Sequence, residues 1–276
     1  GNMTDSDQVK VSVLLEDKTI NKYAAQALIR MANNSSSEIT LLVINSETQS
    51  KSEGTFIRPL QSGVELIRKH GLWFPIIAKR ALRPPPYAKQ VHVDEIDCLS
   101  SADKVEANTI PANGLGNKLP EPVVDKIARD SDIVVRFGFG IIKGEILSKP
   151  KFGVLSFHHG DIRKYRGRAG GFWAYINNDP VAGVTLQRLN ESLDGGEIAI
   201  YKSVDIDDAN TLGEIRRRTH NASKNMLAEA INDINNGEFN PSEPDHLGKI
   251  YTKRSAQDVM TYWRKTLVGH MKNILG

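Results

Sequence analysis

Residues 153–167 read Gly-Val-Leu-Ser-Phe-His-His-Gly-Asp-Ile-Arg-Lys-Tyr-Arg-Gly, an apolar run followed at once by a polar cluster. The run predicts a buried strand, and the cluster containing His158 follows its carboxyl end. In an open α/β sheet, ligands bind outside the carboxyl ends of the strands. A second apolar run, residues 184–189, ends close to Asp194. We therefore expect two strand ends to bring His158 and Asp194 together over one crevice.

The chain before this stretch predicts a parallel sheet. Residues 9–15 and 39–44 are apolar enough for buried strands, and the apolar residues between them recur at helical spacing after a possible cap, Asn21. Strand, helix and strand at this spacing are typical of a βαβ unit. We predict an α/β fold: a Rossmann-like, mostly parallel sheet flanked by helices.

Further elements are predicted with less regular patterns. A strand is expected over 133–137 after a helix over 122–129, and another over 91–96. Residues 100–119 are mostly polar with several Gly and Asn residues, so we expect a loop there.

The carboxyl-terminal part predicts helices. Thr211 to Glu214 is a capping box that opens a helix with an apolar face, and Gly237 ends that helix. Ser255 to Asp258 is a second capping box before a terminal helix, which could pack on the domain or contact a second copy in a homodimer. We expect a catalytic domain over 1–240 and a helical extension over 241–276.

Composition excludes some classes of protein. The chain has 276 residues, a net charge of +3 and a pI near 8.8, too mild a basicity to indicate a nucleic-acid partner by itself. The single Cys98 cannot form an internal disulfide, so we expect a reducing, cytoplasmic location. No apolar run approaches the roughly 20 residues that cross a bilayer, and no signal peptide is visible.

Residues 56–83 mix apolar and aromatic residues with lysines and arginines, among them Arg68, Lys69, Lys79, Arg80 and Arg83, and Pro84-Pro85-Pro86 ends the segment. One interpretation is one or two amphipathic helices with solvated cations. The alternative is a basic, aromatic flap over an anionic substrate.

The central stretch resembles the formyltransferases that take their one-carbon unit from 10-formyltetrahydrofolate. The resemblance rests on four elements in the same order: Phe157-His158, Lys164-Tyr165-Arg166-Gly167, Gly183-Val184-Thr185 and Leu193-Asp194-Gly195-Gly196. It implies an N-formyltransferase that uses 10-formyltetrahydrofolate and acts on a small amine. Residues 172–177 resemble the corresponding helix of the sugar-nucleotide formyltransferases, which favours an amino sugar on a nucleotide carrier.

The resemblance also implies roles for single residues. His158 would donate a hydrogen bond to the oxyanion that develops on the formyl oxygen, and Asp194 would orient His158 or accept protons through water. Ser156 stands where the family has an Asn that helps to hold that oxygen. A shorter donor there requires a closer backbone, a water or another side chain such as His159.

A glycine loop, residues 138–144, follows the strand over 133–137. By resemblance this loop carries the folate site, with the pterin bound by backbone groups of Phe139, Gly140, Ile141 and Ile142. The alternative is a tight turn in which glycine permits positive φ.

Several alternatives remain. The protein could hydrolyse formyltetrahydrofolate, act like a methionyl-tRNA formyltransferase, or bind folate without turnover. The expected absence of an appended barrel domain after Gly237 argues against tRNA. A metal site is not expected, because His158 and His159 point to opposite faces of a strand. A hydrolase with Ser156 as nucleophile lacks the G-x-S-x-G elbow.

Overall fold

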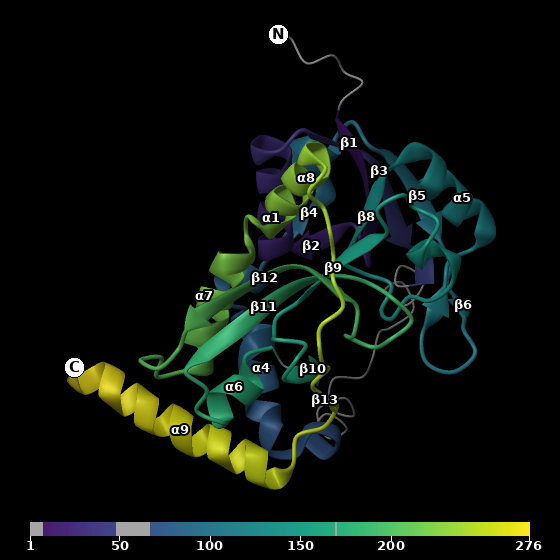
Figure 1. Cartoon of the computed structure of the whole chain (residues 1–276). Helices are drawn as coiled ribbons and strands as arrows, with labels where there is room; N and C mark the ends of the chain where they lie inside the picture. Colours follow the sequence, from purple (N-terminus) through teal and green to yellow (C-terminus); the bar gives the residue numbers. More distant parts are fainter. Residues whose placement is uncertain (1–7, 48–66, 169) are drawn as a thin grey trace.

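The computed structural model describes residues 8–47, 67–168 and 170–276. Its centre is a seven-stranded sheet of order β12-β11-β9-β8-β1-β3-β5 (Figure 1). The strands are β1 (Val9–Leu15), β3 (Ser37–Asn45), β5 (Asp103–Ala107), β8 (Ile133–Arg136), β9 (Val154–His158), β11 (Val181–Arg188) and β12 (Glu197–Asp205). The pairs from β5 to β9 are parallel, whereas β11 is antiparallel to both β9 and β12. This confirms the predicted mostly parallel α/β sheet.

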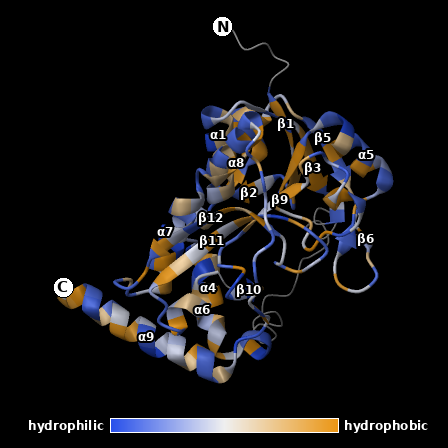
Figure 2. Ribbon diagram, viewed as in Figure 1, coloured by the Kyte–Doolittle hydropathy of each residue, from blue (hydrophilic) through white to orange (hydrophobic). Residues whose placement is uncertain are grey.

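Helices cover both faces of the sheet, which is why its central strands are apolar on both sides (Figure 2). On one face, α1 (Lys22–Asn34) and α8 (Met226–Asn236) pack residues such as Leu28 and Leu227 against Val13. On the other face, α5 (Glu121–Asp130) packs Ile127 against the alternate side chains of the same strands. Two buried layers therefore hold the sheet rigid beneath the polar residues at its edge.

A third apolar cluster lies beyond the sheet and is mostly aromatic. It joins Trp73 to Phe172 and Tyr262, whose rings meet edge to face or stacked. These residues come from η2 (Gly71–Trp73), α6 (Phe172–Ile176) and the terminal helix α9 (Ala256–Leu275). The extension over 241–276 therefore packs against the residues of the central stretch.

Short elements complete the chain. The two-stranded pairs are β2 (Thr19–Asn21) with β4 (Gln90–His92), β6 (Ile110–Pro111) with β7 (Asn117–Lys118), and β10 (Tyr165–Gly167) with β13 (Lys249–Tyr251). The remaining helices are α4 (Phe74–Leu82), α7 (Leu212–Ser223), η3 (Pro86–Ala88), η4 (Val93–Glu95), η5 (Asp97–Leu99) and η6 (Glu145–Leu147). No described helix is long and apolar enough to cross a membrane.

Three sequence expectations about these elements are wrong. Residues 91–96 hold only the end of β4 followed by 3-10 turns, because Val93 and Ile96 pack into the core as anchors of a loop. Residues 100–119 contain β5, an edge strand whose mainly polar residues are compatible with solvent on its open side. The single helix expected from Thr211 to Gly237 is two helices, since the chain breaks at Lys224-Asn225.

Among the predicted caps, Asn21 stands at the N-cap position of α1 but forms no side-chain cap hydrogen bond. Ser255 forms a complete capping box with Asp258 at the start of α9. At α7, Thr211 accepts a hydrogen bond from the Glu214 amide, but the Glu214 carboxylate accepts from the amide of Asn210 instead of that of Thr211. Helix α8 ends at Gly237 in the left-handed conformation, as predicted. Of the segment 56–83, residues 56–66 lie outside the described part, and the remainder includes the amphipathic helix α4.

Candidate active site

A row of polar side chains crosses three neighbouring strands at one level of the sheet. The strand register places Arg136 of β8 beside Ser156 of β9, and Ser156 beside Gln187 of β11. His158 lies two residues after Ser156 and is paired with Thr185. Because side chains alternate along a strand, these five residues share one face. The predicted catalytic residues Ser156 and His158 therefore lie together with Thr185, from a matched motif, and with Arg136 and Gln187, which the sequence analysis did not select.

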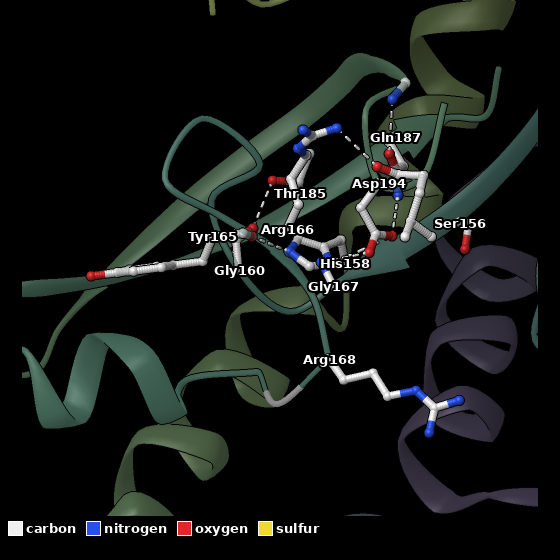
Figure 3. Close-up of polar contacts among 12 residues, drawn as sticks. Ser156, His158, Gly160, Tyr165, Arg166, Gly167, Arg168, Thr185, Gln187 and Asp194 are labelled. Carbon is white, nitrogen blue, oxygen red and sulfur yellow. Dashed lines mark hydrogen bonds and ion pairs between the residues drawn. The ribbon is translucent and has the colours of Figure 1, made fainter. Parts of the chain in front are cut away.

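His158 is held in one orientation by the backbone. Its ring is only 9% exposed, and Nε2 lies 2.7 Å from the carbonyl oxygen of Tyr165 (Figure 3). A carbonyl oxygen can only accept a hydrogen bond, so Nε2 carries the ring proton and donates a hydrogen bond to the Tyr165 carbonyl. The nitrogen left for chemistry is Nδ1, which accepts a proton when the ring is neutral and donates one when the ring is charged.

Gly160 makes room for this ring. A Cβ built at Gly160 would lie 2.7 Å from His158 Nε2, closer than packed atoms approach. The Gly160 carbonyl accepts a 2.8 Å hydrogen bond from Thr185 Oγ1, which fixes the turn after β9. The glycine in the predicted motif is thus required by the histidine two residues before it.

Asp194 faces the free nitrogen of His158. Its Oδ1 lies 3.8 Å from Nδ1, and its Oδ2 accepts a 2.9 Å hydrogen bond from the Gly167 amide. Gln187 Nε2 donates to Oδ1 over 3.4 Å. These contacts aim the carboxylate at the ring, where it would stabilise the protonated imidazole. The structure thus places His158 and Asp194 together as expected.

The route by which they meet is not the expected one. Because β11 runs antiparallel to β9, the carboxyl end of each of these strands lies beside the amino end of the other. Asp194 instead sits in the loop between β11 and β12, with a positive φ of 41°, and this loop turns back toward β9 (Figure 3). The loop, and not a shared end of two strands as expected from the sequence, accounts for the proximity of His158 and Asp194.

Arg166 fastens this loop to the carboxyl-terminal extension. Its Nη1 donates to the carbonyl of Leu193 over 3.2 Å, and its Nε donates to the carbonyl of Gly248 over 2.6 Å. Gly248 precedes β13, which pairs in parallel with β10. The extension therefore supports Asp194 through one guanidinium.

Arg136 connects Ser156 to the predicted folate loop. Its Nη1 donates to Ser156 Oγ over 3.0 Å, and its Nε donates to the carbonyl of Gly140 over 2.7 Å. Burial lowers the pKa of the Arg136 guanidinium, whereas the negative charge of Asp194 raises it. Since arginine only donates, Ser156 must accept from it and keeps its own hydroxyl proton for another acceptor.

The four residues predicted to bind folate form an anchored turn. Phe139 and Gly140 both have positive φ, at 68° and 59°, and the Phe139 amide donates to Glu16 over 2.7 Å. The carbonyl of Ile141 accepts from Asn117, and the side chains of Phe139 and Ile142 are buried. A Cβ at Gly140 would meet no atom within 4 Å, so a ligand could approach the turn from that side.

His159 lies away from the polar row. Its ring stacks on Phe157 and on His220, with centroids 5.9 and 4.3 Å apart, and meets Tyr23 edge to face. Phe157 lies on the face of β9 opposite Ser156, because side chains alternate along a strand, and His159 stacks on Phe157. His159 is therefore not the donor that was expected to compensate for the short Ser156 side chain; Arg136 contacts Ser156 instead. No group of three or more His, Cys, Asp or Glu side chains in the described ranges is placed to hold a metal ion.

A pocket opens beside His158, on the side of Tyr165. It is lined by glycines of the turn after β9, by the aromatic residues Tyr165, Trp173 and Tyr201, and by the charged residues Asp161, Lys164, Arg168 and Asp179. Asp161 is paired with Arg163 over 2.8 Å, which lowers the pKa of the carboxyl group although burial opposes the shift. The pocket offers mixed polar and aromatic walls next to the histidine.

Together, the fold and the polar row define an α/β protein whose site suits acyl transfer to a nitrogen: hydroxyl and guanidinium donors lie beside a buried histidine and a half-buried aspartate. Residues 99–231, just under half of the chain, match the formyl transferase family. Among its relatives, the methionyl-tRNA formyltransferase of Thermotoga neapolitana is 35% identical over 121 residues, 44% of this chain and 39% of the relative. That of Ehrlichia chaffeensis is 27% identical over 199 residues, 71% of this chain and 60% of the relative. The chain thus spans less than two thirds of either relative.

Solved structures share the fold at low sequence identity. A 4-N formyltransferase from Francisella tularensis is 12% identical with a TM-score of 0.55, covering 94% of this chain and 88% of that one. The glycinamide ribonucleotide transformylase 1 from Symbiobacterium toebii is 14% identical with a TM-score of 0.53, covering 87% and 95%. Both confirm the formyltransferase α/β fold.

Proposed function

We propose that this protein transfers a formyl group from 10-formyltetrahydrofolate to the amino group of a small molecule, an amino sugar on a nucleotide carrier. The observation that carries the proposal is the His158–Asp194 pair, held beside Ser156 and Arg136 in a formyl transferase domain. The turn over 139–142 would hold the folate, and Arg136 would keep that turn in register with Ser156.

The donor supplies an electrophilic formyl carbon, to which the amine nitrogen bonds while the bond to the folate nitrogen breaks. Ser156 would donate its hydroxyl proton in a hydrogen bond to the formyl oxygen as negative charge develops there, and the Arg136 guanidinium would strengthen that donor. His158 Nδ1 would take the proton from the attacking amine and return one to the departing folate nitrogen. Asp194 would stabilise the charged imidazole between these steps.

The roles of His158 differ in one respect from the sequence expectation. Its Nε2 proton is used in the hydrogen bond to the Tyr165 carbonyl, so Nδ1 of the neutral ring carries no proton. Nδ1 would therefore act first as a base, and could donate to an oxyanion only after it has taken up a proton. Ser156, strengthened by Arg136, would then be the first donor to the formyl oxygen. Ser156 would thus act at the formyl oxygen, and His158 would act at the nitrogens that gain and lose the formyl group.

Three observations bear on the identity of the acceptor. The N-formyltransferase from Helicobacter canadensis was solved with folinic acid and dTDP-3-aminofucose, and its TM-score to this chain is 0.53 at 13% identity. The sequence relatives from Thermotoga neapolitana and Ehrlichia chaffeensis are methionyl-tRNA formyltransferases, which makes methionyl-tRNA the second candidate. The pocket beside His158 has aromatic and charged walls. Such walls suit a sugar better than the unbranched side chain of a methionyl group.

The experiment is to mix the protein with 10-formyltetrahydrofolate alone, and then with nucleotide-linked amino sugars or with methionyl-tRNA. Donor loss only in the presence of an amino sugar supports the proposal. Donor loss without any amine would identify a hydrolase, and loss only with methionyl-tRNA would assign the tRNA reaction. Folate binding without loss under every condition would identify a binding protein.

A further inference from the structure

A second groove lies away from the polar row, where three helical elements meet. Its walls come from α4 and the turn that follows, from the first turn of α7, and from the middle of α9. The lining residues include Lys79, Arg80, Arg83, Tyr87, Thr211, Leu212, Gly213, Arg216, Tyr262, Thr266 and His270. Three cations of the basic, aromatic segment over 56–83, Lys79, Arg80 and Arg83, line this groove.

The charge of the groove is one-sided. Four of its lining residues are lysines or arginines, and no Asp or Glu belongs to the described lining. None of Lys79, Arg80, Arg83 and Arg216 forms an ion pair within the part of the chain that the structure describes. Like charges gathered in a concave surface create a positive potential that attracts anions.

Arg216 is the most enclosed of these cations. Its Nε donates to the carbonyl of Gly170 over 3.2 Å, and its side chain also hydrogen-bonds Tyr87. Burial lowers the pKa of its guanidinium, and the charge of Arg80 lowers it further. A partly buried cation held by neutral partners beside another cation is costly unless an anion joins it.

The amino end of α7 adds backbone donors to the same groove. The Thr211 side chain is already bound to the Glu214 amide, but the amides of Leu212 and Gly213, in the first turn, have no partner within the helix. A Cβ at Gly213 would meet nothing nearer than 3.8 Å, so this turn is open. Helix amino ends with free amides bind phosphate groups.

We propose that this groove binds a phosphate group of a small molecule through Arg80, Arg216 and the first turn of α7. Tyr87, at the groove, stacks on His220 with centroids 4.2 Å apart, and His220 stacks on His159, the neighbour of His158. The phosphate could belong to the acceptor whose amine reaches His158 or to a separate ligand. The chemistry of recognition is the same in both cases.

The test is calorimetric titration of the full chain with inorganic pyrophosphate at low ionic strength. We expect binding that weakens about tenfold in Arg80→Gln and in Arg216→Gln, as for the loss of one charge-assisted hydrogen bond. Arg217→Gln is the matched control, because Arg217 is exposed on the same helix and does not line the groove. Arg80 is exposed, so its variant remains informative if Arg216→Gln does not fold.

No pyrophosphate binding by the parent protein at millimolar concentration would overturn the proposal, as would an equal loss in Arg217→Gln. A pyrophosphate site that persists in the presence of a formyl-accepting amine indicates a separate ligand. Competition between them, with a raised KM for the amine in Arg80→Gln, indicates the phosphate of the acceptor. The pyrophosphate titrations of the parent protein and of the variants are made without turnover, so the existence of the phosphate site is tested independently of the proposed formyl transfer; only the assignment of the phosphate to the acceptor rests on that function.

Discussion

Arg136 Nη1 donates a 3.0 Å hydrogen bond to Ser156 Oγ, and the two residues are register partners on adjacent parallel strands. By this contact Ser156 shares its position in the polar row with a charged donor. The guanidinium fills the space beside the serine and adds a positive charge to it. Two residues would thus perform the task of one.

The first prediction concerns this guanidinium. Arg136→Met should lower kcat for formyl transfer by about 10²–10³, the usual cost of removing an oxyanion donor. Arg188→Met is the control, since Arg188 is a partly buried arginine on β11 that pairs with Glu197, outside the polar row. Single-turnover rates and thermal melts of both variants separate a catalytic loss from a loss of stability. A normal rate in Arg136→Met would remove Arg136 from the mechanism.

Ser156 provides the second prediction. Ser156→Asn should lower activity, because the side chain is only 3% exposed and Arg136 already occupies the space that an amide would need. Overpacking of this kind commonly costs about 1–3 kcal/mol. The double variant Ser156→Asn with Arg136→Ala makes room for the amide and should recover part of the rate. A faster reaction in Ser156→Asn alone would contradict this account.

Gly160 gives a third prediction that needs no change of charge. Gly160→Ala places a Cβ 2.7 Å from His158 Nε2, so the ring must move and lose its hydrogen bond to Tyr165. We expect kcat to fall by at least about tenfold, given the sensitivity of catalysis to misplacement. Folding should be retained, as checked by circular dichroism. An unchanged kcat would show that the ring orientation seen here is not required.

The fourth prediction is the loss of stability in acid. Burial lowers the pKa of His220 from 6.5 to about 4, so the folded protein keeps this ring neutral while the unfolded chain takes up a proton. The free energy of unfolding should therefore fall as pH drops from about 6.5 toward 4, by up to roughly 3 kcal/mol. Denaturant melts across this range should show a smaller fall in His220→Asn. His246→Asn, at an exposed position, should behave like the parent.

Much of the fold could be predicted from the sequence because most of its strands are apolar runs. The edge strand β5 escaped prediction, since Asp103, Lys104 and Glu106 alternate with few apolar residues. The break between α7 and α8 was missed because Lys224 and Asn225 are compatible with a helix, and only packing against two different parts of the sheet separates them.

A site residue could be predicted from the sequence only where it stands in a contiguous sequence motif. His158 and Asp194 stand in recognisable motifs, and both lie in the site. Arg136 was missed because it is a lone charge at the end of an apolar strand, and its position beside Ser156 depends on the register of β8 with β9. Gln187 was missed for the same reason, since it reaches Asp194 from a paired strand.

The most direct measurement of the central claim is single-turnover formyl transfer from 10-formyltetrahydrofolate to the amine that supports turnover, with the parent protein and with His158→Ala. We expect the parent protein to move the formyl group to the amine, and the variant to do so about 10²–10⁴-fold more slowly with an unchanged fold. Transfer by His158→Ala at a near-normal rate, or no transfer by the parent protein to any amine, would contradict it.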